Sequence, residues 1–269
     1  MRSDRQRRRE IKDYYLGISA DEITSYLTPA SFDLWQSVTR YRRELGIGAR
    51  WLEIGGGLGD LAATALDHGY DVLMTDVQPE LLESAAARHP RLAGRLERSD
   101  IFDARDVAAL GARGPFSIVA ALGAVLNHAR DHRELARGFG HLVTLAAPGA
   151  LLIVDVMLSE MFPGHPSSIW ADILHVLPGF DDLARLTRSS GLQVLEAHSL
   201  YHRYPPTPTF DADFDERMLR LFLLRAGRTP DAPAVKSSRR ARPDSPRRAP
   251  SPSRDSSGAR RATRRRRRA

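Results

Sequence analysis

From residue 50 onward, short apolar runs alternate with longer amphipathic stretches in a β-α-β rhythm. Such an alternation predicts a mostly parallel sheet with helices on both of its faces. The rhythm stops between residues 201 and 217, where a loop with three prolines replaces a crossover helix. We therefore expect the last two strands to pair antiparallel. The sequence predicts an α/β fold, a three-layer sandwich around a mostly parallel seven-stranded sheet with an antiparallel last strand.

The expected elements have lengths typical of strands and helices. The strands are predicted at residues 50–54, 70–75, 94–99, 116–122, 150–156, 192–201 and 217–226. The helices between them are predicted at residues 58–69, 79–89, 104–112, 131–146 and 180–191.

The basic character of the chain is confined to its two ends. The formal net charge is +7, but residues 1–12 carry +4 and residues 227–269 carry +12, which leaves −9 for residues 13–226. An acidic body argues against nucleic acid as its partner, while the basic tail has the charge for non-specific contact with phosphates. The chain has no cysteine, which excludes disulfides, thiolate catalysis and zinc–cysteine sites.

Three segments follow from these patterns. Residues 1–49 have apolar residues at helical spacing, interrupted at Thr28-Pro29, and are expected to form a helical N-terminal cover or lid. Residues 50–226 form the main domain. Residues 227–269 are rich in Arg, Pro and Ser and are expected to be disordered. Two explanations of this tail stay open: a functional basic arm, or translation of GC-rich coding DNA in a shifted reading frame.

The start of the chain is basic but lacks the apolar centre of a signal peptide. The longest apolar run, residues 116–126, is too short to cross a bilayer. These observations predict a cytoplasmic protein.

A cluster of glycines in WLEIGGGLGDLA, residues 51–62, joins the first strand of the alternation to its first helix. Glycine allows sharp backbone turns and close approach of a ligand. The free N–H groups at the start of the helix favour a carboxylate or phosphate. An ordinary turn between a strand and a helix needs about one glycine, whereas this one has four in five positions. The segment therefore predicts a nucleotide-like ligand.

Two fingerprints fit the glycines. Gly57-x-Gly59-x-x-Ala62, with Asp76 further on, satisfies the dinucleotide pattern. Glu53-x-Gly55-x-Gly57-x-Gly59 resembles motif I of the class I, Rossmann-like, S-adenosylmethionine-dependent methyltransferases. The second reading is favoured because Asp76 and Asp100 end successive predicted strands, and because an antiparallel last strand is typical of this family.

The resemblance implies a methyltransferase that uses S-adenosyl-L-methionine and acts on an oxygen, nitrogen or carbon of a small molecule. It implies that Asp76 holds the ribose hydroxyls, that Asp100 accepts the adenine amine and that Ile101 flanks the ring. The expected cofactor-binding residues are Tyr14, Glu53, Gly55, Gly57, Gly59, Asp76, Val77, Asp100, Ile101, Leu122 and Gly123. Two alternatives remain: an NAD(P)-dependent oxidoreductase with the same loop, and a non-catalytic S-adenosylmethionine-binding module.

In this family the end of the fourth strand faces the methyl donor, which makes Asn127 and His128 the catalytic candidates. His128 titrates near neutrality and could remove a proton from the acceptor; a capping or orienting histidine is the alternative. Tyr14 or Tyr15 could close over the cofactor. No metal site is expected, because the spacing of His165 and His175 matches no compact ligand motif. The candidates for the acceptor pocket are Met161, Phe162, His165, Trp170, His175, His198, Tyr201, His202, Tyr204 and Phe210.

Overall fold

The computed structural model describes residues 33–161, 176–204 and 214–227, together with Arg9, Lys12, Asp13 and Leu16. All of these residues belong to one compact unit, Met1–Pro230. The helical cover predicted for residues 1–49 is therefore described only in part, and nearly all of the tail predicted for residues 227–269 lies outside the described residues.

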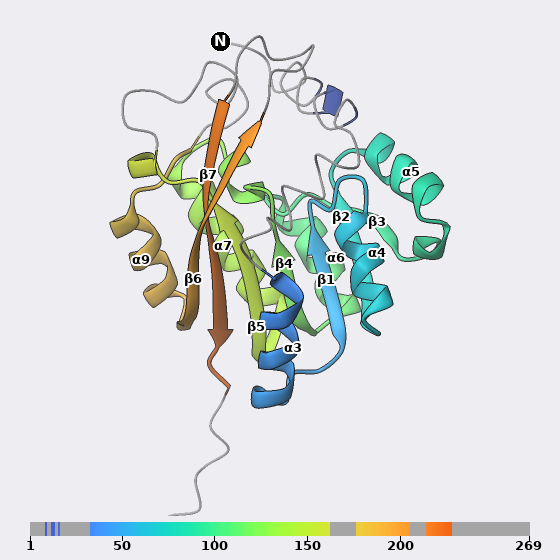
Figure 1. Ribbon diagram of the computed structural model, residues 1–269, viewed down its shortest axis with the longest axis horizontal. Helices are drawn as coiled ribbons and strands as arrows, with labels where there is room; N and C mark the ends of the chain where they lie inside the picture. Colours follow the sequence, from blue (N-terminus) through green and yellow to red (C-terminus); the bar gives the residue numbers. More distant parts are fainter. Residues whose placement is uncertain are drawn as a thin grey trace, which may run out of the picture. The chain divides into compact units, whose positions relative to one another are not determined.

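A seven-stranded sheet with the order β3-β2-β1-β4-β5-β7-β6 forms the centre of this unit (Figure 1). Strands β1 to β5 pair in parallel, whereas β7 lies antiparallel between β5 and β6. This arrangement confirms the predicted sheet and its antiparallel last strand. The strands are β1 (Arg50–Ile54), β2 (Asp71–Asp76), β3 (Leu96–Arg98), β4 (Phe116–Ala121), β5 (Ala146–Val156), β6 (Leu192–Tyr204) and β7 (Phe214–Arg225).

Helices cover both faces of the sheet, as the β-α-β alternation predicts. Helices α3 (Leu34–Leu45), α4 (Asp60–Asp67) and α5 (Pro79–Arg88) pack on one face. Helices α6 (Ala104–Arg113), α7 (His132–Leu145) and α9 (Phe180–Ser189) pack on the other. Three short 3-10 turns, η1 (Pro90–Leu92), η2 (Val125–His128) and η3 (Ser159–Met161), complete the described elements.

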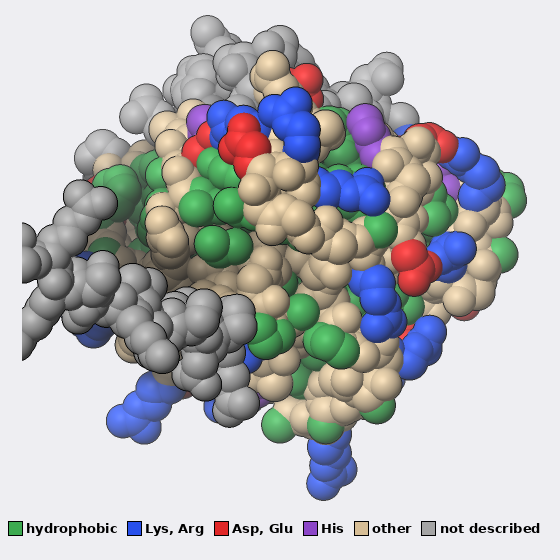
Figure 2. Space-filling view, turned by 90° about the horizontal axis from the view of Figure 1, so that it is seen from below, with side chains coloured by type: hydrophobic (Ala, Val, Ile, Leu, Met, Phe, Trp, Pro, Cys, Tyr) green, Lys and Arg blue, Asp and Glu red, His purple; other side chains and the backbone are tan. Residues whose placement is uncertain are grey.

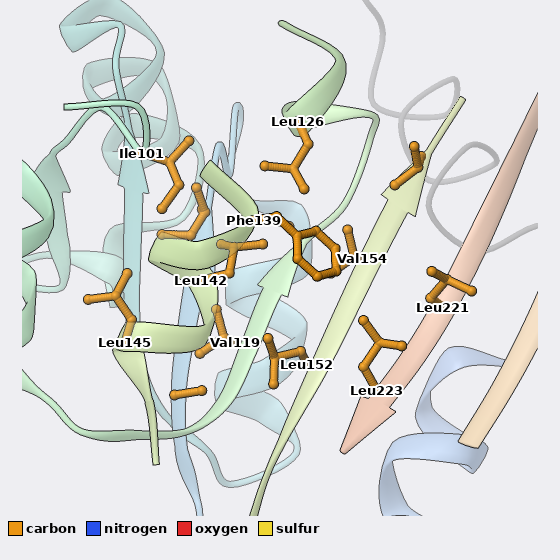
Figure 3. Packing of buried hydrophobic residues seen from close by; sticks show 14 of the residues in the cluster. Ile101, Val119, Leu126, Phe139, Leu142, Leu145, Leu152, Val154, Leu221 and Leu223 are labelled. Atoms are coloured by element: carbon orange, nitrogen blue, oxygen red, sulfur yellow. The ribbon is translucent and has the colours of Figure 1, made fainter. Parts of the chain in front are cut away.

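The central strands are buried on both faces, which explains their nearly continuous apolar sequences. Figure 3 shows Phe139 and Leu142 of α7 next to Leu152 and Val154 of β5, with Leu223 of β7 beyond them. All five side chains are at most 1% exposed. Close packing of this kind holds the strand ends in fixed positions.

Several strand boundaries differ from the prediction. Strand β6 ends at Tyr204 and not at 201, and strand β7 begins at Phe214 and not at 217. Strand β5 begins at Ala146, four residues before the predicted 150, because Ala146 pairs with Phe116 of β4 ahead of a register shift. Strand β3 is shorter than predicted and has only three residues. At the start of β5 and in β3, backbone pairing with a neighbouring strand sets the boundary, whereas the apolar pattern of the strand itself does not.

Candidate cofactor-binding and catalytic site

The loop between β1 and α4 owes its shape to glycines in the left-handed backbone region. Gly55 has a φ of 68° and Gly57 a φ of 54°, values that residues with side chains rarely adopt. A Cβ on Gly55 would lie 2.6 Å from Cγ2 of Val125, so the loop following β4 presses directly on it. A Cβ on Gly57 would meet no atom within 4 Å. The loop is thus tightly packed at Gly55 and open at Gly57.

Asp76 ends β2 and is fixed by two backbone donors. Its Oδ2 accepts a hydrogen bond from the N–H of Gly57 at 3.0 Å, and its Oδ1 accepts one from the N–H of Gln78 at 2.9 Å. Burial raises the pKa of Asp76, while these two hydrogen bonds oppose the rise. The carboxylate therefore stands at the junction of the glycine loop and the start of α5.

Glu53 is buried in β1 just before the glycine loop. Its Oε2 has no hydrogen-bond partner among the described residues. Burial raises the pKa of Glu53 to about 8, and the negative charges of Asp60 and Asp76 add to the rise. A positive charge brought close to such a group stabilises its ionised form. Glu53 and its acidic neighbours Asp60 and Asp76 therefore fit a ligand that carries a cationic group.

The segment after β3 forms a third part of the site, next to the glycine loop and Asp76. The N–H of Ser99 donates to the carbonyl of Asp76 at 3.0 Å, which joins the ends of β2 and β3. Oδ1 of Asp100 accepts from the N–H of Phe102 at 2.9 Å, so a local turn orients this carboxylate. Ile101 is 4% exposed. The Oγ of Ser99 is buried and has no partner in the part of the chain that the structure describes.

These segments surround a cavity of about 590 Å³ at the carboxyl ends of the parallel strands, where ligands bind in open α/β sheets. The predicted residues on its wall are Gly55, Gly57, Asp76, Val77, Asp100, Ile101 and His128. Four other predicted residues, Glu53, Gly59, Leu122 and Gly123, are not on the wall. Gly59 instead allows helix packing, because a Cβ there would lie 2.9 Å from Cδ1 of Leu92.

The two catalytic candidates have different surroundings. His128, at the end of η2, is partly buried and lines the cavity. Asn127 is 0% exposed and does not line it. The Nδ2 of Asn127 donates to the carbonyls of Met157 and Val176, and its Oδ1 accepts from the N–H of Met157. The amide of Asn127 therefore holds backbone segments together, and the catalytic role expected for this residue stays a prediction.

A protein-family model described as a methyltransferase domain matches residues 52–152. The match runs from β1 into β5 and includes the glycine loop, Asp76, Asp100 and His128. Residues 52–152 are therefore similar to a methyltransferase domain. The sheet order agrees, because the dinucleotide-binding fold has the order 3-2-1-4-5-6, without an antiparallel strand between the fifth and sixth. No curated protein matches this sequence.

Solved structures share the fold at low sequence identity. An S-adenosylmethionine-dependent methyltransferase from Clostridium acetobutylicum has a TM-score of 0.54 and 14% identity, covering 76% of this chain and 96% of its own. Magnesium protoporphyrin IX methyltransferase from Synechocystis, with bound SAH, has a TM-score of 0.52 and 14% identity, covering 81% of this chain and 100% of its own. The N-methyltransferase NodS from Bradyrhizobium japonicum, in complex with S-adenosyl-L-homocysteine, has a TM-score of 0.52 and 19% identity, covering 80% of this chain and 97% of its own.

The cavity wall also contains charged residues that were not predicted from the sequence. Arg130 and Arg137 both contact Glu134, with Nη2–Oε1 distances of 2.6 and 2.9 Å. The guanidinium of Arg130 holds the pKa of Glu134 below its ordinary value. The sequence spacing of each arginine from Glu134, four residues for Arg130 and three for Arg137, could have indicated these contacts. The same spacing is also typical of a solvated helix face. The other missed lining residues are Ile54, Gln78, Leu81, Ser99, Phe102, Asp103, Ala104 and Val125.

Several predicted residues cannot be placed. Tyr14 and Tyr15 lie outside the described residues, although the nearby Lys12 contacts Glu80 of α5 at 3.1 Å. Of the acceptor candidates, Met161 and His198 are described but do not line the cavity. The candidates outside the described residues are Phe162, His165, Trp170, His175 and Phe210, and only the backbone is described for Tyr201, His202 and Tyr204.

Among the residues that the structure describes, no cluster of three or more histidine or carboxylate side chains is arranged to hold a metal ion. Within the same residues, no helix has the length and apolar character needed to cross a bilayer.

Proposed function

We propose that this protein transfers a methyl group from S-adenosyl-L-methionine to an oxygen, nitrogen or carbon of a small molecule. The observation that carries the proposal is a single cavity at the carboxyl ends of β1, β2, β3 and β4. The open glycine Gly57, the buried carboxylate of Asp76, the Asp100-Ile101 turn and His128 all contribute to its wall.

Each group has a distinct part in holding the cofactor. Asp76 already faces two backbone donors, so its remaining lone pairs are oriented to accept hydroxyl groups. Glu53 is buried at the end of β1 and does not line the cavity, but a cationic group of the ligand would stabilise its ionised form from the cavity side. Ile101 offers an apolar surface beside the Asp100 carboxylate for a planar ring. The cofactor, when bound, supplies an electrophilic methyl group on a sulfonium that is already a good leaving group.

For the transfer itself, we propose that His128 orients the acceptor and accepts its proton where the acceptor atom needs deprotonation. His128 supports this role by its place on the cavity wall, at the end of the loop that follows β4. Alignment of the acceptor with the methyl group is expected to provide most of the acceleration, because the leaving group needs little assistance.

A small molecule is the proposed acceptor for reasons of charge. The body of the chain is acidic, and on the face shown in Figure 2 the basic side chains are scattered among acidic and other residues. Such a surface is poorly suited to a polyanion. Two structures with the same fold belong to a magnesium protoporphyrin IX methyltransferase and an N-methyltransferase. The cytoplasmic location expected from the sequence stays a prediction.

Calorimetric titration with S-adenosylhomocysteine and, separately, with NADH tests the cofactor. Binding of S-adenosylhomocysteine alone is expected, and binding of NADH alone would refute the proposal. A thermal-shift screen of metabolites in the presence of S-adenosylhomocysteine then searches for the acceptor, since a bound ligand raises the apparent stability. With an acceptor identified, His128→Ala should lower turnover and change its pH profile, while leaving S-adenosylhomocysteine affinity unchanged.

A further inference from the structure

A fully buried ion pair joins the neighbouring strands β5 and β7. Asp155 of β5 and Arg220 of β7 face each other in the antiparallel register, and both side chains are 0% exposed. The contact is bidentate, with Nε–Oδ1 and Nη2–Oδ2 distances of 2.7 Å each. Neither residue lines the cavity. A buried pair of this geometry holds its carboxylate in a fixed position.

The pair also reaches the loop between β4 and α7. Oδ2 of Asp155 accepts a hydrogen bond from the N–H of Gly123 at 3.2 Å. Gly123 and Ala124 have φ values of 73° and 57°, and for Ala124 this left-handed conformation is strained. A strained conformation persists only where its surroundings fix it. Asp155 supplies one such attachment, and the amide of Asn127 supplies a second through Met157.

The loop held in this way forms part of the cavity wall. Val125 follows Ala124 and lies against Gly55, where an added Cβ would come within 2.6 Å of it. Gly55, Val125 and His128 all line the cavity. A shift of the loop would therefore move Val125 relative to the glycine loop and move His128 relative to the bound ligand.

We infer that Asp155 and Arg220 are positioning residues of the methyltransferase: the guanidinium fixes the carboxylate, and the carboxylate fixes Gly123 and the loop that carries Val125 and His128. A role in stability alone would not require the charges, because buried ion pairs are often replaced by apolar side chains without loss of stability. The inference rests on the proposed function, since it assigns the loop to the S-adenosylmethionine site.

Two double variants separate positioning from stability. Asp155→Leu with Arg220→Met removes both charges, fills the space with apolar atoms and leaves Gly123 without its acceptor. Asp155→Asn with Arg220→Gln also removes both charges, but its amide oxygen can still accept from Gly123. Circular dichroism and thermal unfolding report the fold of each variant, and calorimetry measures its affinity for S-adenosylhomocysteine.

The apolar double variant is expected to stay folded and to bind S-adenosylhomocysteine about tenfold or more weakly, the loss typical of removing a hydrogen bond that supports a binding group. The amide double variant should bind within about threefold of the unmodified protein, less than the ~1 kcal/mol net value of one hydrogen bond. Equal affinity in both variants, whether normal or reduced, would overturn the inference.

Hydrogen exchange over residues 122–128 provides a second measurement that does not depend on ligand binding. The loop should be protected in the unmodified protein and in the amide double variant. If the apolar double variant does not fold, fast exchange of this loop in a folded amide variant with normal S-adenosylhomocysteine affinity would overturn the inference. If the unmodified protein does not bind S-adenosylhomocysteine, the proposed function fails, while the exchange experiment still tests the attachment of the loop.

Discussion

At the scale of single residues, Glu53 shows how a binding site can act against the stability of its own fold. Its carboxyl is buried, its pKa is raised to about 8, and Asp60 and Asp76 add negative charge nearby. The folded state therefore disfavours ionisation of Glu53, whereas in the unfolded chain this carboxyl ionises near its ordinary pKa of 4.5. The free energy of unfolding should be unaffected below that pH, fall as the pH rises, and reach its full loss above about 8.

The substitution Glu53→Gln removes this penalty. Without ligand, we expect the variant to be more stable than the unmodified protein at pH 8, by at most about 5 kcal/mol. At pH values below the ordinary pKa of a glutamate, the free energy of unfolding should depend on pH in the same way in both proteins. Its affinity for S-adenosylhomocysteine should fall. Urea unfolding at several pH values and calorimetry measure the two effects. Glu44→Gln on the exposed end of α3 serves as the control, and equal pH dependence in both variants would contradict the prediction.

Asp76 gives a second test at this scale. Asp76→Asn replaces one carboxylate oxygen by an N–H₂ group, which then faces one of the two backbone donors, the N–H of Gly57 or that of Gln78. We expect S-adenosylhomocysteine binding to weaken by about 2–3 kcal/mol, the value of a hydrogen bond to a charged group. Asp71→Asn at the exposed start of the same strand is the matched control and should bind normally. An unchanged affinity of the Asp76→Asn variant in calorimetry would exclude the proposed ribose contact.

At the scale of elements, the glycine loop and the loop after β4 are two backbone turns that fit against each other. Their contact at Gly55 and Val125 joins the turn after β1 to the strained turn after β4. Left-handed residues in both loops bring the chain to the same edge of the sheet. The shape of the cavity therefore depends on backbone conformation as much as on side chains.

The substitution Gly57→Ala tests the open position of the glycine loop, with Gly46→Ala as its match. Both glycines have a positive φ, and a Cβ on either would meet no atom within 4 Å. Each variant should lose about 1–2 kcal/mol of unfolding free energy from backbone strain. Only Gly57→Ala should also weaken S-adenosylhomocysteine binding, because Gly57 lines the cavity and Gly46 does not. Parallel losses of affinity in the two variants would show that strain, and not space, is responsible.

The elements also show what a sequence can predict. The pairing of β6 with β7 follows from a missing crossover helix, a purely local signal. The role of Asn127 does not follow from a local signal. The three hydrogen bonds of its side chain go to backbone atoms of Met157 and Val176, 30 and 49 residues away. The Asp155–Arg220 pair likewise depends on the register of β5 against β7. Local pattern predicts which elements form, whereas contacts across strands decide which polar groups serve the site.

At the scale of the whole molecule, the opposite charges of the body and the tail suggest a division of binding properties. Residues 13–226 carry −9 and residues 227–269 carry +12. The cofactor cavity lies entirely in the acidic body. Contact with polyanions, where it occurs, is therefore expected to come from the tail and to be sensitive to salt.

Deleting residues 228–269 tests this division. The shortened protein should keep the thermal unfolding profile and the S-adenosylhomocysteine affinity of the full chain, because the described core ends with β7 and Gly227. Binding to a random double-stranded DNA should be lost, whereas the full chain should bind it and lose about 1000-fold in affinity between 50 and 200 mM salt. Fluorescence anisotropy measures both. Salt-dependent DNA binding that survives the deletion would locate the contact in the acidic body and would reopen nucleic acid as a substrate.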